Sequence, residues 1–234
     1  MESVYLRKKG EKIMTKRLGF TLAEVLITLG IIGVVAAMTM PTLMNQTNGA
    51  QYKTAYKKAL SALSQAVVLN VALDEYNFAD LDASTYKLTD MLSNRMNVVK
   101  KDVGVVKLAD GTTEYKAKDT TGKTGVNGDV SVAETNTTLY FNDGIMFSFP
   151  TESKDCTMDT TKGAAGRSKV CKGFIDVNGI KAPNKLIKCD SGTPGGTGAN
   201  ACQVSNPVDV YPVFFYDQTI LPNSDAGRAV LYAK

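Results

Sequence analysis

The chain has 234 residues, of which 44% are hydrophobic, and a formal net charge of +4 from 27 basic and 23 acidic residues. It contains no histidine, which removes the commonest general base of enzymes, the Ser-His-Asp and Cys-His arrangements and most metal sites. No spacing of paired carboxylates or of serine and lysine suggests another catalytic centre. We therefore expect a protein that is not an enzyme and that needs no cofactor.

The positive charge lies at the N-terminus. Residues 1–19 contain six basic and two acidic side chains, a difference equal to that of the whole chain. Residues 20–234 therefore carry equal numbers of basic and acidic residues, and bulk charge gives no reason to predict nucleic-acid binding.

Residues 20–40 form an apolar stretch that follows this basic segment. As a helix it would be about 32 Å long, close to the hydrocarbon thickness of a bilayer. Basic residues beside a membrane span stay in the cytoplasm, so we expect one span with the rest of the chain outside the cytoplasm. The stretch contains one charged residue, Glu24. A carboxylate there costs up to about 2.5–3.5 kcal/mol at the bilayer centre, which an ordinary anchor has no reason to bear.

Three interpretations of this stretch are open. It could be a simple N-terminal anchor, or a secretory signal peptide cut after the small residues 35–37, so that the mature chain begins at Met38. In the third interpretation, a cut between Gly19 and Phe20 leaves a free α-amine on Phe20. That amine would give the carboxylate of Glu24 a partner of opposite charge.

The segment RLGFTLAE, residues 17–24, resembles the leader junction of type IV prepilins and type II secretion pseudopilins. The resemblance covers residues 16–70, and it includes the apolar helix, Pro41 and the polar helical continuation. It implies a basic leader, residues 1–19, that is removed; translation could start at Met1 or at Met14.

The resemblance also implies roles for individual residues. A membrane peptidase would cut after Gly19 and methylate the new N-terminus at Phe20. Glu24 would form an assembly salt bridge with the Phe20 amine of a neighbouring subunit, and Pro41 would mark a functional weak point in the helix. Residues 20–44 would be the transmembrane and assembly helix.

Residues 45–75 continue the helix with a polar composition. Large side chains recur at steps of three and four residues, which places them on one face of a helix. We expect this stripe to pack on the chain's own globular domain, with a partner-docking face as the alternative. Its members are Tyr52, Tyr56, Leu60, Leu63, Val67 and Asn70.

Residues 76–234 are expected to form the globular domain. A short helix is predicted at 88–96, after which the hydrophobic period shifts toward two. The expected fold class is therefore α+β, with a long N-terminal helix packed on an antiparallel sheet. The predicted hairpins join 103–108 to 113–117 and 138–141 to 145–149, and further strands are predicted at 174–177, 210–216 and 228–232.

Asp176, Asn178 and Gly179 follow the pattern of a fragment of a calcium loop. The remaining acidic ligands and the terminal glutamate of such a loop are missing. We therefore predict a β-turn here and no metal site.

The four cysteines lie in the C-terminal third, which the predicted orientation places in an oxidising compartment. They form no CxxC pair, so we predict disulfides. Sequential pairing is favoured because each bond would close a short loop, and two other connectivities remain open. The residues are Cys156, Cys171, Cys189 and Cys202.

The resemblance implies a structural subunit of a type II secretion pseudopilus, which assembles into a helical filament that drives protein secretion. A type IV pilus subunit, major or minor, is the first alternative, and a membrane-tethered binding domain that does not assemble is the second. The implied partners are other pilin-like subunits, the prepilin peptidase and methylase, and an inner-membrane assembly platform. The subunit would cross the inner membrane once, with its C-terminal domain periplasmic or extracellular.

Overall fold

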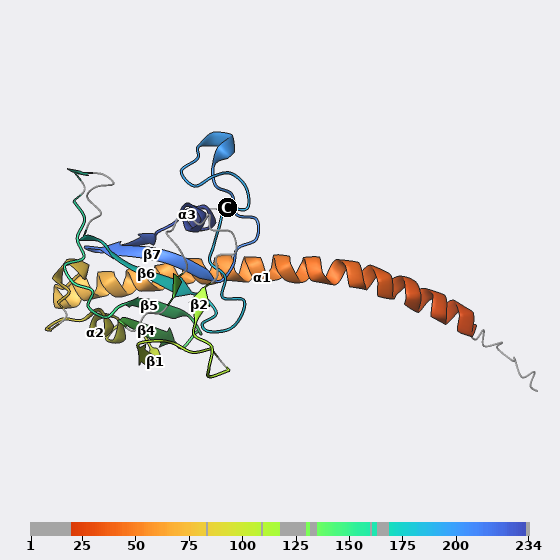
Figure 1. Cartoon of the computed structure of the whole chain (residues 1–234), viewed down its shortest axis with the longest axis horizontal. Helices are drawn as coiled ribbons and strands as arrows, with labels where there is room; N and C mark the ends of the chain where they lie inside the picture. The colour runs from red at the N-terminus through yellow and green to blue at the C-terminus, as the bar shows by residue number, and fades with distance from the viewer. Residues whose placement is uncertain are drawn as a thin grey trace, which may run out of the picture. The chain divides into compact units, whose positions relative to one another are not determined.

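The fold is α+β, with a long N-terminal helix followed by a six-stranded antiparallel sheet, as predicted (Figure 1). The chain divides into two compact units, one ending at Leu43 and the other beginning at Met44. The leader, including Gly19, Met1 and Met14, lies outside the described residues. The computed structural model describes residues 20–82, 84–108, 110–117, 130–131, 135–159, 161–162 and 169–232.

Helix α1 runs from Leu22 to Asp74 and continues through Pro41. Its apolar first part is long and hydrophobic enough to cross a membrane by length and composition. The large side chains of this part are exposed, including Leu26, Ile31 and Met38. An apolar surface that is exposed to water is unfavourable. A bilayer or other helices can bury it.

The sheet has the strand order β1-β4-β5-β6-β7-β8, and every neighbouring pair is antiparallel. Strands β2 and β3 form a separate two-stranded pair. The elements after α1 are η1 (Phe78–Asp80), α2 (Leu88–Ser93), β1 (Val98–Val103), β2 (Lys116–Ala117), β3 (Val130–Ser131), β4 (Asn136–Phe141), β5 (Met146–Pro150), β6 (Cys171–Asp176), η3 (Gly198–Asn200), β7 (Val210–Tyr216), β8 (Thr219–Pro222) and α3 (Asp225–Tyr232).

The predicted stripe of α1 packs on the globular domain. Tyr56 and Val67 are completely buried, and they share one hydrophobic core with the sheet residues Phe147 and Phe215. The ring of Tyr56 stacks on that of Tyr211 in β7, with 3.8 Å between the ring centroids. Burial of this stripe attaches the second half of α1 to the sheet.

Asn70 is the polar residue of the stripe, and it bonds to two backbone carbonyls. Its side-chain amide donates to the carbonyl of Ala66 at 2.8 Å and to that of Met91, in α2, at 3.0 Å. Because Asn70 is fully buried, these bonds satisfy its side-chain N–H groups, whereas its Oδ1 has no hydrogen-bond partner among the described residues. They also connect α1 to α2.

The β4–β5 hairpin and the strands β6 and β7 confirm four of the predicted strands. The β4–β5 hairpin turns at Gly144, which has a φ of 84° that favours glycine. After β6, the backbone N–H of Asn178 donates to the side chain of Asp176 at 3.0 Å, and Gly179 has a φ of 72°. The predicted turn at residues 176–179 is therefore present.

One strand prediction was wrong, and one predicted hairpin is shorter than expected. Residues 228–232 belong to helix α3, because the hydroxyl of Ser224 accepts from the N–H of Gly227 at 3.0 Å and Arg228 pairs with Asp225 one turn away. The hairpin of residues 103–108 and 113–117 is present around the bridge between Lys107 and Glu114. The backbone N–H of Leu108 donates to the carbonyl of Thr113, and that of Tyr115 donates to the carbonyl of Val106, both at 2.8 Å. Residues 116–117 pair instead with β3.

Candidate functional site

The site with a predicted role in assembly begins just before helix α1. Phe20 is 87% exposed, and the helix starts two residues later at Leu22. Glu24 lies in the first helical turn. Phe20, the predicted new N-terminus, therefore precedes the helix directly, and the predicted assembly residue Glu24 lies in its first turn.

Glu24 is hydrogen-bonded within its own chain. Its Oε2 accepts from the backbone N–H of Thr21 at 2.8 Å and from the Thr21 hydroxyl at 2.9 Å. The Thr21 hydroxyl oxygen in turn accepts from the backbone N–H of Glu24 at 3.2 Å. This reciprocal arrangement is a capping box, which satisfies backbone donors that a helix N-terminus leaves free.

The capping box was missed in the sequence, although Thr21 and Glu24 have its S/T-x-x-E spacing. The capping box gives the carboxylate of Glu24 a structural role within its own helix. A negative side chain at a helix N-terminus is also favoured by the helix dipole. Glu24 therefore has a partner inside the single subunit, before any neighbour arrives.

The other polar side chains of the apolar stretch are also satisfied internally. The Thr28 hydroxyl donates to the carbonyl of Glu24 at 2.9 Å, and the Thr39 hydroxyl donates to that of Val35 at 3.0 Å. Bonds of this kind let a hydroxyl lie in hydrocarbon without an unsatisfied donor. The described part of the stretch is thus compatible with a membrane.

Two glycines leave the backbone of the stretch open. A Cβ added at Gly30 or at Gly33 would meet nothing within 4 Å, so a second helix can approach the backbone closely there. Pro41 lies within the continuous helix and supplies no backbone N–H. Its role as a weak point remains a prediction.

The structure has disulfides between Cys156 and Cys171 and between Cys189 and Cys202, the pairing that the sequence favours. The first joins the segment after β5 to the start of β6.

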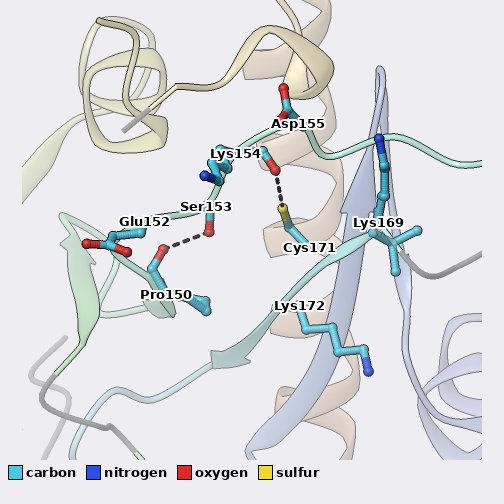
Figure 2. Close-up of a pocket in the computed structure, with 9 residues that line it drawn as sticks. Pro150, Glu152, Ser153, Lys154, Asp155, Lys169, Cys171 and Lys172 are labelled. Carbon is cyan, nitrogen blue, oxygen red and sulfur yellow. Dashed lines mark hydrogen bonds between the residues drawn. The ribbon is translucent and has the colours of Figure 1, made fainter. Parts of the chain in front are cut away.

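A cavity of about 470 Å³ lies beside the disulfide between Cys156 and Cys171 (Figure 2). Both signs of charge line this cavity, so its electrostatics select no single class of ligand. The lining residues are Pro150, Glu152, Ser153, Lys154, Asp155, Lys169, Val170, Cys171 and Lys172.

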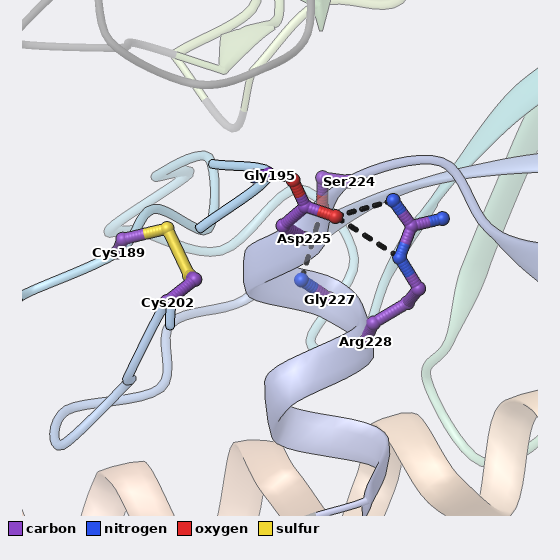
Figure 3. A network of polar contacts seen from close by, with 7 residues as sticks. All are labelled: Cys189, Gly195, Cys202, Ser224, Asp225, Gly227 and Arg228. Carbon is purple, nitrogen blue, oxygen red and sulfur yellow. Dashed lines mark hydrogen bonds and ion pairs between the residues drawn. A yellow bond between two sulfur atoms is a disulfide. The ribbon is translucent and has the colours of Figure 1, made fainter. Parts of the chain in front are cut away.

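The second disulfide closes a glycine-rich loop that is attached to α3. The backbone N–H of Gly195 donates to the Asp225 carboxylate at 2.6 Å, and the same carboxylate pairs with Arg228 (Figure 3). A Cβ at Gly196 would lie 2.0 Å from the carbonyl oxygen of Asn200, so only glycine fits there. The disulfide thus closes this loop, and the bond from Gly195 to Asp225 connects it to α3.

Asp176 is a buried carboxylate that the sequence did not reveal as unusual. Burial raises its pKa to about 8, and the hydrogen bond donated by the Tyr115 hydroxyl offsets part of that increase. Burial also raises the pKa of Asp209, whose carboxylate accepts from the backbone N–H groups of Asn184 and Lys185 at 2.7 Å each. Within the residues that the structure describes, no three acidic or cysteine side chains gather as metal ligands.

Comparisons with known proteins agree with the leader junction. Residues 14–40 match the family described as the prokaryotic N-terminal methylation motif. Over 79 residues the chain is 38% identical to the type II secretion system core protein G of Vibrio cholerae serotype O1. The match covers 34% of this chain and 47% of that protein, so the chain spans about half the length of this relative. No solved structure matches the chain at a significant level.

Proposed function

We propose that this chain, which belongs to the type IV pilin-like family, is a structural subunit of a type II secretion pseudopilus. The methylation motif over residues 14–40 carries this proposal, together with an exposed apolar helix that begins directly after the predicted cut. The similarity to a type II secretion core protein favours a pseudopilus over a type IV pilus. In this role the chain is the substrate of a peptidase and a methylase and does not itself catalyse a reaction.

Processing removes residues 1–19 and exposes the α-amine of Phe20. An α-amine has a reference pKa near 7.7–8.0 and a glutamate near 4.3, so both are charged at neutral pH, and N-methylation keeps the positive charge. The subunit then stays in the inner membrane through its apolar stretch, with residues 44–234 on the periplasmic side.

Assembly brings the Phe20 amine of one subunit to Glu24 of another. The capping box uses Oε2 of Glu24. Oε1 takes part in neither of those bonds, so a neighbour's amine can approach it while the capping box stays closed. A buried ion pair adds little net stability, but a missing partner strands a charge at a cost of about 3–5 kcal/mol. Glu24 therefore sets the register of packing between helices.

Replacing Glu24 tests this mechanism. Glu24→Ala should leave membrane insertion and leader removal intact and should abolish incorporation into filaments, measured as the chain recovered in sheared filament fractions. Thr28→Val is the matched control, because it removes a polar group of the same stretch that bonds only within its own helix turn. Incorporation of Glu24→Ala at the wild-type level would favour a tethered domain that does not assemble.

A further inference from the structure

Strand β1 is one edge of the six-stranded sheet, and among the described residues only β4 pairs with it. Gly104, directly after β1, donates its backbone N–H to β4 at 2.9 Å. Hydrogen-bonded residues alternate along an antiparallel strand, so Asp102 also bonds to β4. The N–H and C=O groups of Lys101 and Val103 therefore point away from the sheet.

The side chains along this edge are apolar and basic. Val103 is 63% exposed, and Val99, which lies within the bulge of β1, is 68% exposed. Lys100 pairs with Asp102 at 2.6 Å, whereas the ammonium of Lys101 pairs with no acidic side chain among the described residues. The edge therefore presents one uncompensated positive charge between two exposed valines.

A row of outward backbone groups recognises an extended chain, which adds a strand to the sheet. The main-chain bonds supply affinity, and the side chains directly opposite one another supply selectivity. Opposite Lys101 the favourable side chain is acidic, because opposite charges stabilise a cross-strand pair. Opposite Val99 and Val103 the favourable side chains are apolar.

A second copy of the chain does not offer such a segment at either edge of its sheet. Two antiparallel β1 strands would set Lys101 opposite another lysine or opposite Val103, since these two residues supply the outward groups. The other edge, β8, has the sequence TILP, which contains no acidic residue. Its last residue, Pro222, has no backbone N–H to donate.

We infer that the edge of β1 binds an extended segment of a partner protein, in which an acidic residue lies between two apolar residues at alternate positions. The bound segment forms a seventh strand of the sheet beside Lys101 and Val103. This binding goes beyond filament assembly, because β1 lies in the second unit and shares no residue with the leader junction.

Hydrogen exchange of the full chain in detergent, followed by nuclear magnetic resonance, tests the inference. In the free chain the amides of Lys101 and Val103 should exchange rapidly, and those of Asp102 and Gly104 slowly, because only the latter bond to β4. The probe is the synthetic peptide TVTETVT. At about ten times its dissociation constant it should slow exchange at Lys101 and Val103 by about tenfold. Slow exchange at these two amides in the free chain, or unchanged exchange with the peptide, would overturn the inference.

Substitutions on the edge separate the charge from the backbone bonds, with binding measured by fluorescence anisotropy of the labelled peptide. Lys101→Glu should weaken binding of TVTETVT by roughly fivefold and strengthen binding of TVTKTVT. Lys181→Glu is the matched control, because Lys181 is exposed outside the sheet. It should bind both peptides as the wild type does.

Val103→Pro removes one outward N–H and no bond to β4, so it should abolish binding without changing thermal unfolding. A TVTETVT peptide that is N-methylated at its valines and glutamate should not bind the wild type. Equal effects of Lys101→Glu and Lys181→Glu, or full binding of the N-methylated peptide, would show the inference to be wrong. Neither leader removal nor filament assembly enters these measurements, so their failure leaves the proposed function untouched.

Discussion

Replacing Asp176 by asparagine should stabilise the globular domain, and the gain should grow as the pH rises. Asp176 is completely buried, and burial raises the pKa of its carboxyl from the usual 3.8 to about 8. Asparagine has the same shape and is neutral. It can still accept from the N–H of Asn178 and can still face the hydroxyl of Tyr115, both of which donate to the carboxylate.

The free energy that Asp176 contributes to folding falls as the pH rises. Because the pKa of Asp176 is higher in the folded than in the unfolded state, its contribution to stability is complete below pH 3.8 and is lost as the pH rises toward 8. Each pKa unit corresponds to about 1.4 kcal/mol. The wild-type domain should therefore lose at most about 6 kcal/mol through this residue, of which about 4 kcal/mol is lost between pH 5 and pH 8.

The assay is urea unfolding of the full chain in detergent at pH 5 and pH 8, followed by near-ultraviolet circular dichroism of the tyrosines. The difference in free energy of unfolding between Asp176→Asn and wild type should increase by about 4 kcal/mol between these pH values. Asp110→Asn is the control. The Thr113 hydroxyl and backbone lower the pKa of Asp110, so its effect should be the same at pH 5 and pH 8. A difference for Asp176→Asn that stays constant would show that the folded carboxyl is already ionised at pH 5.

Three further substitutions probe the core and the capping box. Leu63→Ala should lower the free energy of unfolding by about 2–5 kcal/mol, because Leu63 is 2% exposed in the core between α1 and the sheet. Tyr211→Phe should leave that free energy unchanged or raise it by about 1 kcal/mol, since the buried hydroxyl finds no hydrogen-bond partner among the described residues; urea unfolding measures both. Thr21→Val should destabilise the first turn of α1 by about 1 kcal/mol, measured by hydrogen exchange of its amides in detergent. A neutral Leu63→Ala, a strongly destabilising Tyr211→Phe or unchanged exchange in Thr21→Val would each contradict the reasoning.

Local patterns predicted the parts of the fold that depend on neighbours in sequence. The apolar stretch, the stripe through Tyr56 and Val67, and the β4–β5 hairpin with its Asn-Asp-Gly turn all have short-range signals. The stripe and the hairpin also agree with the packing that the structure shows.

Pairing between distant segments could not be predicted in this way. Residues 116–117 pair with Val130–Ser131 rather than closing a hairpin with their own neighbours, and short β8 (Thr219–Pro222) was not expected at all. For α3 a local signal existed, because Ser224 precedes an Asp225–Arg228 pair at helical spacing. The run of apolar residues at 229–232 favoured a strand instead.

The candidate site was predictable in its residues but not in its contacts. Phe20 and Glu24 follow from the leader pattern, whereas the bond between Glu24 and Thr21 needed the three-residue spacing to be recognised as a capping box. Asp176 accepts a hydrogen bond from Tyr115, which lies 61 residues away in sequence. No pattern within the turn at residues 176–179 indicates that contact.

The central claim is that the chain is cut after Gly19 and then assembles through its new N-terminus. Mass spectrometry of the N-terminal peptide from the mature protein, purified from its native host, tests this claim most directly. We predict a peptide that begins with N-methylated Phe20. A mature chain that retains residues 1–19, or one that begins at Met38, would contradict the account.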